Sequence, residues 1–81
     1  MGREDIIESF LDGAMKGKAS SLSINGNILY SYSIGIARRE GDDIYVNNRK
    51  YSSTTTTQQN AVKRIARARA LNVHEVSPDE I

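Results

Sequence analysis

The residue types best suited to chemistry are hydroxyl side chains gathered just after the middle of the chain. Residues 51–57 read Tyr-Ser-Ser-Thr-Thr-Thr-Thr and stand directly before a segment with the periodicity of a basic helix. The start of a helix offers free backbone N–H groups and the positive end of the helix dipole, which suits a phosphate. Two interpretations stay open. Thr54, Thr55 and Thr56 either contact a phosphate or only cap the helix.

Basic side chains follow in the same part of the chain. The formal net charge is +1 over 81 residues, yet no acid occurs between Ile44 and Asn72, where six Lys and Arg residues lie. Such side chains neutralise phosphates and release counterions, and tyrosines can stack on bases. A solvated helix face, or contact with an acidic protein surface, would use the same charges. The basic residues predicted to contact a partner are Arg49, Lys50, Lys63, Arg64 and Arg67, and the tyrosines are Tyr30, Tyr32, Tyr45 and Tyr51.

Catalytic and metal-binding groups are sparse. The chain has one histidine, His74, and no cysteine, and no segment has the spacing of a nucleophile elbow, a P-loop or a metal site. The acidic pair Asp42 and Asp43 is typical of a turn. We therefore expect no enzymatic activity, no metal and no cofactor. The lack of cysteine fits a reducing compartment, and no apolar run approaches ~18 residues, so we expect a cytoplasmic protein without membrane contact.

The elements that position these residues follow from the apolar spacing. Residues 3–15 have one apolar stripe, which predicts a helix. Alternation on both sides of Asn25-Gly26-Asn27 predicts a hairpin. Further strands are expected at 34–39, where Gly35 indicates a bulge or bend, then at 44–47 and 50–53. The fold class is thus α+β, with a small antiparallel meander of three to five strands covered by an N-terminal and a C-terminal helix.

A second helix is predicted from about residue 57 to residue 70. Thr55 with Gln58, or Thr56 with Gln59, has the spacing of a capping box. Ala61, Val62, Ile65 and Ala68 share one face at helical spacing, while Lys63, Arg64 and Arg67 lie on the other. We expect one domain over residues 1–73 and a short acidic tail over 74–81. A chain of this size without disulfides has a thin core, so self-association into a homo-oligomer stays open.

The middle of the chain contains Ser31-Tyr32, Ile36-Ala37, Val46-Asn47 and the run Lys50 to Thr55. In this combination it resembles a family of small uncharacterised proteins of bacteriophages and related viruses. That family has an "SYxTxIA" strand, a turn, a "VN" strand and "KYSxTT" shortly before a His-Gln pair. These residues match the family pattern, whereas Ile34 replaces the Thr and Gln58 the His. The resemblance covers about residues 22–65 and implies a viral accessory protein in an infected cell.

Together these observations predict a small binding protein that contacts nucleic acid through its basic C-terminal helix and the adjacent strand. The alternative is a protein-binding inhibitor of a host factor, such as a nucleic-acid-guided defence complex, using the same surface. A self-associating structural viral protein is the third hypothesis. The expected partners are therefore nucleic acid, a host or viral protein, or a second copy of the chain.

Overall fold

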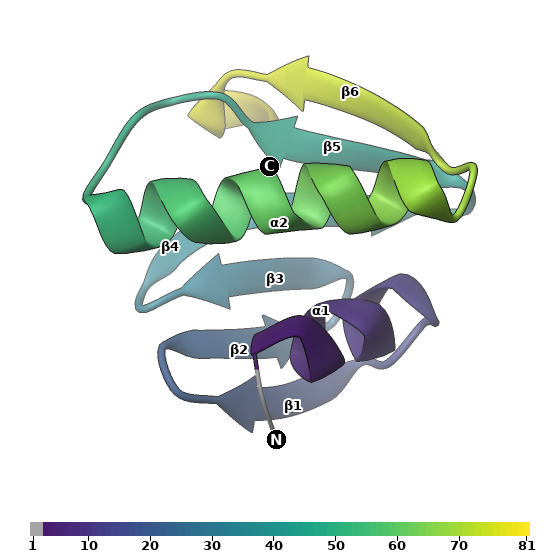
Figure 1. Ribbon diagram of the computed structural model, residues 1–81, viewed down its shortest axis with the longest axis horizontal. Helices are drawn as coiled ribbons and strands as arrows, with labels where there is room; N and C mark the ends of the chain where they lie inside the picture. Colours follow the sequence, from purple (N-terminus) through teal and green to yellow (C-terminus); the bar gives the residue numbers. More distant parts are fainter. Residues whose placement is uncertain (1–2) are drawn as a thin grey trace.

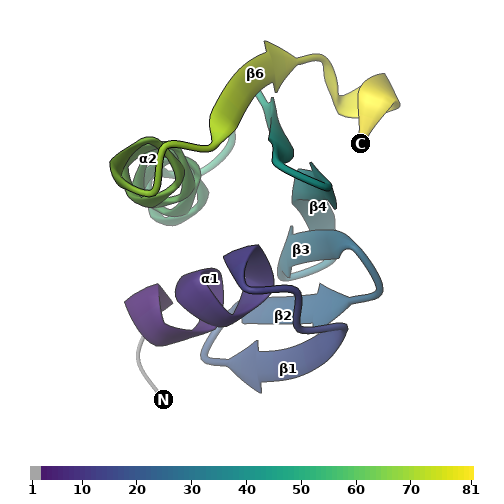
Figure 2. The ribbon, with the colours of Figure 1, turned by 90° about the vertical axis from the view of Figure 1, so that its right-hand side faces the viewer.

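The computed structural model describes residues 3–81, so residues 1 and 2 of the expected domain lie outside it. Six strands form one sheet, and both helices lie on the same side of it (Figure 1, Figure 2). The predicted α+β class is confirmed, but the sheet has six strands instead of three to five. The elements in chain order are α1 (Arg3–Leu11), β1 (Lys16–Ala19), β2 (Leu22–Asn25), β3 (Ile28–Ser31), β4 (Ile34–Glu40), β5 (Asp43–Asn47), α2 (Ser53–Ala68), β6 (Asn72–Val76) and the 3-10 turn η1 (Pro78–Glu80).

The order of strands across the sheet repeats their order in the chain. Strands β1 to β5 form the predicted antiparallel meander, and β6 then runs parallel to β5 after the chain crosses over through α2. Strands β1 and β6 were not predicted from the sequence, and the strand predicted at residues 50–53 is a loop that leads into α2. The expected acidic tail over residues 74–81 contains most of β6 and all of η1.

Each missed strand has a tertiary cause. In β1, Gly17 has no side chain, and the strand is held by its pairing with β2, where Gly17 lies opposite Ile24. The backbone of β6 pairs along β5, and Asn72 N donates to Asp42 O at 2.9 Å. Neither strand has the alternation of apolar and polar residues by which strands are predicted, so the local sequence pattern did not indicate them.

Four hairpin turns of two residues connect the meander, and in each the first turn residue has positive φ. These residues are Ser20 (φ 57°), Gly26 (φ 67°), Tyr32 (φ 57°) and Gly41 (φ 60°). The turn predicted at Asn25-Gly26-Asn27 is confirmed. Between β3 and β4 the pairing shifts, because Leu29 faces Ala37 while Tyr30 faces Gly35. The bulge predicted around Gly35 is therefore present, with Ile36 as the extra residue.

The helices differ from their predicted bounds. Helix α1 ends at Leu11 instead of residue 15, before Gly13 at φ 104°. Helix α2 begins about four residues earlier than predicted, because Ser52 is the N-cap and its Oγ accepts from Thr55 N at 3.3 Å. The two predicted capping boxes are thus wrong, and Gln58 and Gln59 are buried in the second turn.

The core lies between the two helices and the face of the sheet that they cover (Figure 2). Helix α1 packs over β1 and β2, and α2 packs over β4, β5 and β6. The predicted apolar stripes are confirmed at Ile6, Ile7, Phe10 and Leu11 in α1, and at Ala61, Val62 and Ile65 in α2. This packing fixes the axis of α2, so the loop before it is held at one end of the sheet.

Candidate functional site

Three connections meet at one end of the sheet. They are the turn at residues 20–21, the turn at 32–33 and the loop 48–52 with the first turn of α2; we call this region the loop end (left side of Figure 1). Tyr32 N donates to Ser21 O at 2.7 Å, which joins the two turns. Ser31 Oγ lies 3.1 Å from Thr55 Oγ1, which joins the second turn to α2. The loop end gathers most of the serines and threonines of the chain.

A run of hydrogen bonds crosses this end, buried at its centre and partly buried at its two ends. Ser31 donates its hydroxyl proton to Gln58 Oε1, so Thr55 is the donor toward Ser31. Ser52 Oγ donates to Thr55 Oγ1 at 3.3 Å, and Gln58 Nε2 donates to Ser21 Oγ at 2.6 Å. We call the run Ser52–Thr55–Ser31–Gln58–Ser21 the hydroxyl relay. Thr55 is only 1% exposed and belongs to this relay, so the structure places it beneath the surface.

The loop after β5 is held by two buried amide side chains. Asn47 is 2% exposed, and its Nδ2 donates to Gly35 O and to Tyr51 Oη, each at 3.0 Å. Its Oδ1 accepts from Arg49 N at 2.9 Å. From α2, Gln59 Nε2 donates to Asn47 O at 2.8 Å and to Arg49 O at 3.1 Å. The backbone that carries Arg49 is therefore tied to both the sheet and the helix.

This loop forms one wall of a groove of about 160 Å³, which we call the basic groove. Four of the eight predicted site residues line it, namely Arg49, Lys50, Thr56 and Lys63. The remaining lining residues are Asn47, Asn48, Gln59, Asn60 and Glu75. Thr54 is exposed in the first turn of α2, next to this groove in the chain. The structure thus brings together residues from the loop, the helix and β6.

The other predicted basic residues are spread over α2. Lys63 Nζ lies 3.3 Å from Glu75 Oε1 on β6, whereas Arg64 Nη2 lies 2.8 Å from Glu4 Oε2 on α1. The two side chains therefore project from opposite flanks of the helix. Arg67 is exposed near the other end of α2. The acid-free stretch of the sequence is accordingly partly neutralised in space by acids from α1 and β6.

Two of the three cations that line the basic groove have no acidic partner among the described residues. Within residues 3–81, no ion pair involves Arg49 or Lys50, and both side chains are exposed. The guanidinium of Arg49 lies 5.6 Å from the centre of the Tyr51 ring. The backbone N–H and carbonyl of Arg49 bond the side chains of Asn47 and Gln59, and Lys50 is the next residue. The groove therefore presents unpaired cations in a defined place, together with hydroxyl and amide groups.

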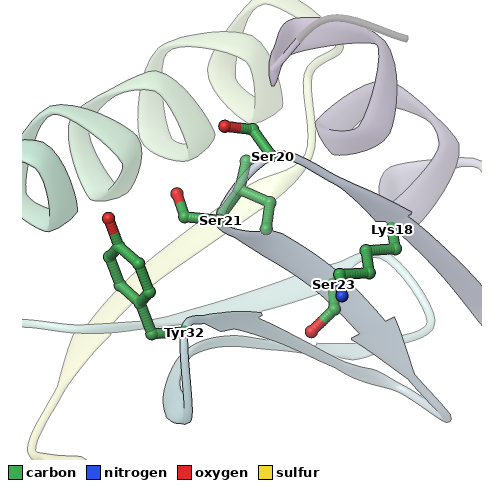
Figure 3. Close-up of a pocket in the computed structure, with 6 residues that line it drawn as sticks. Lys18, Ser20, Ser21, Ser23 and Tyr32 are labelled. Carbon is green, nitrogen blue, oxygen red and sulfur yellow. The ribbon is translucent and has the colours of Figure 1, made fainter.

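A second hollow opens at the loop end beside Tyr32 (Figure 3). Its volume is about 460 Å³, and we call it the Tyr32 cleft. Tyr32 is among the tyrosines predicted to stack on bases. The residues around it were not predicted as a site, because Lys18 lies on the unpredicted strand β1 and the turn at residues 20–21 forms only when β1 pairs with β2. The lining residues are Lys18, Ser20, Ser21, Leu22, Ser23 and Tyr32.

The described residues provide no cluster for metal chemistry. Within residues 3–81, no group of three His, Asp or Glu side chains is placed to hold a metal ion. His74 stacks on Tyr45, with ring centres 4.9 Å apart, and its Nε2 lies 3.0 Å from Asp43 Oδ1. In the same part of the chain, no helix is long and apolar enough to cross a membrane.

Comparison with known proteins found no relative of this chain. No protein-family model, curated protein or solved structure matches this chain.

Proposed function

We propose that the protein binds nucleic acid through the basic groove and catalyses no reaction. Arg49 and Lys50 contact phosphates, and the hydroxyls of Thr54 and Thr56 add hydrogen bonds at the start of α2. Phosphate contacts of this kind position a protein on a nucleic acid without reading its sequence. Lys63 lines the wall of the groove, and its ion pair with Glu75 neutralises the one acidic residue that also lines it.

The observation that supports this proposal is the hydrogen-bonded backbone of Arg49, which carries an unpaired cation directly before Lys50. A solvated lysine or arginine on a surface loop needs no ordered backbone, because water satisfies it in any position. Here the backbone of Arg49 makes hydrogen bonds through both its N–H and its carbonyl to the buried side chains Asn47 and Gln59. Fixing a charge before binding reduces the entropy lost when a partner docks.

The test compares two double variants with the same net charge. Arg49→Glu with Lys50→Glu reverses the charge of the groove, and Lys16→Glu with Arg67→Glu reverses two exposed cations elsewhere. Lys16 lies beside the Gly26 turn at the opposite end of the sheet, and Arg67 lies near the end of α2. Neither has an ion pair in the described part of the chain.

Binding is measured by fluorescence anisotropy with labelled single-stranded DNA, duplex DNA and RNA over a range of salt. Each lost phosphate contact makes the slope of log K against log salt shallower by about 0.7 on a single strand. For the groove variant we expect the slope of log K against log salt to become shallower by about 1.4, and the affinity at low salt to fall by roughly tenfold or more. Equal losses in both variants would show that net charge, and not the groove, drives binding.

The alternative is a protein-binding inhibitor of a host factor, whose acidic surface would meet the same groove. Nucleic-acid attraction is strongest at low salt, so no binding there to any of the three probes contradicts our proposal. A stoichiometric complex with one host protein, lost in the groove variant, would then select the alternative. Sedimentation at high protein concentration tests the third hypothesis, self-association.

A further inference from the structure

The Tyr32 cleft is built by the two turns of the loop end. Figure 3 shows the Tyr32 ring rising from the β3–β4 turn, with its hydroxyl toward Ser21, while Lys18 and Ser23 lie along the strands at the other side. The Tyr32 side chain is 65% exposed, one of two large apolar side chains described as exposed. The hollow of about 460 Å³ lies within the range of small-molecule sites, ~300–1,000 Å³.

The backbone at Tyr32 is strained, and the turn does not require a tyrosine there. Tyr32 has φ +57°, a conformation that costs a residue with a Cβ roughly 1–2 kcal/mol. At the opposite end of the sheet, the equivalent turn positions are Gly26 and Gly41, which adopt positive φ without this cost. The two-residue turn itself requires positive φ at this position, and Ser20 in the neighbouring turn also has φ 57°. The exposed ring adds little to the core, so the fold does not account for an aromatic side chain here.

We propose that the Tyr32 cleft takes one unpaired base of a nucleic-acid strand, stacked on the Tyr32 ring. The ammonium of Lys18 then lies near an adjoining phosphate, and the serine hydroxyls lie near the sugar or the base edge. A base inside a duplex has both faces covered by its neighbours, so this site selects single strands. The inference rests on the function proposed above and deepens it, because it names the form of nucleic acid that is bound.

The cleft and the basic groove both lie at the loop end. The hydroxyl relay starts at Ser52, directly before α2, and ends at Ser21 in the wall of the cleft. The first turn of α2 therefore separates the two hollows. A strand that crosses this turn places phosphates at Arg49 and Lys50 and one base at Tyr32.

The experiment uses a labelled oligothymidylate and an abasic deoxyribose-phosphate strand of the same length. Both carry the same phosphates, but only the first has bases. Tyr32→Phe keeps the ring, while Tyr32→Gly removes it at a position where glycine is favoured, so this variant keeps the fold. Thermal unfolding of each variant checks that it does.

We expect wild type and Tyr32→Phe to bind oligothymidylate alike, and Tyr32→Gly to bind it about 5- to 150-fold more weakly. The abasic strand should bind wild type and Tyr32→Gly equally. In a nuclear magnetic resonance titration with oligothymidylate, the ring protons of Tyr32 should shift upfield, while those of Tyr45, which stacks on His74, stay unchanged.

Two results would overturn the base site and leave the proposed function standing. One is equal affinity of wild type for the abasic strand and oligothymidylate, with both still weakened by Arg49→Glu and Lys50→Glu. The other is an unchanged affinity of Tyr32→Gly for oligothymidylate. Absence of binding by wild type to every strand at low salt would overturn both proposals together.

Discussion

Replacing Asn47 by alanine is the change that most directly tests how the loop of the basic groove is held. The Asn47 side chain makes three hydrogen bonds, to Gly35 O, Tyr51 Oη and Arg49 N, and is 2% exposed. A net contribution of about 0.5–1.5 kcal/mol for each bond gives a loss of about 2–4 kcal/mol in the free energy of unfolding. The free energy of unfolding of a domain of this size is roughly 4–12 kcal/mol, so the expected loss is a large fraction of it.

The assay is urea unfolding followed by far-ultraviolet circular dichroism. The matched control is Asn48→Ala, because Asn48 is the next residue, is exposed, and uses its backbone N–H to bond Val76 O at 2.8 Å. We expect Asn47→Ala to lower the midpoint with little change in slope, and to lower the melting temperature by about 10 °C or more. If the two variants differ by less than about 0.5 kcal/mol, the loop is not held by these bonds.

Two further substitutions test backbone conformation and close packing. Ala70 follows the end of α2 at φ +60°, and there Ala70 N donates to Arg67 O and Leu71 N donates to Ala66 O. Because glycine adopts this conformation without strain, Ala70→Gly should raise the free energy of unfolding by up to about 1 kcal/mol. A lower melting temperature of the variant would contradict the strain at Ala70. A Cβ on Gly35 would lie 3.0 Å from Ile81 Cγ2, so Gly35→Ala should shift the methyl resonances of Ile81 while β4 stays paired. Unchanged Ile81 resonances would show that this contact is absent in solution.

Local pattern predicted the elements whose apolar residues repeat with a clear period. The stripe of α1 and the hairpin around Gly26 are as predicted. The start of α2 was misplaced because threonine and glutamine at capping spacing also fit a helix interior, where Gln58 bonds Ser31. Strand β6 was missed because its position depends on the free edge of β5, which only the assembled sheet provides.

For the candidate site, the sequence indicated a stretch whose residues the structure brings together only in part, and it did not indicate how their charges are paired. Arg49, Lys50 and Thr56 lie together in the basic groove, as the acid-free stretch suggested. Arg64 pairs with Glu4, which lies 60 residues away in the chain, so its neutralisation is a tertiary property. The Tyr32 cleft depends on the pairing of β1 with β2, which brings Lys18 opposite Ser23.

The match between strand order and chain order has a consequence for how the chain folds. Each antiparallel pair closes through a turn of two residues, so these pairings have little loop-closure entropy to overcome. Strand β6 is different, because the whole of α2 separates it from β5. Until α2 has docked, β5 is an edge strand of the sheet, and its unpaired backbone N–H and C=O groups can pair with another chain. The segment Asn72–Val76 therefore covers the β5 edge only after the chain has crossed over through α2, and β6 then becomes the edge strand on this side of the sheet.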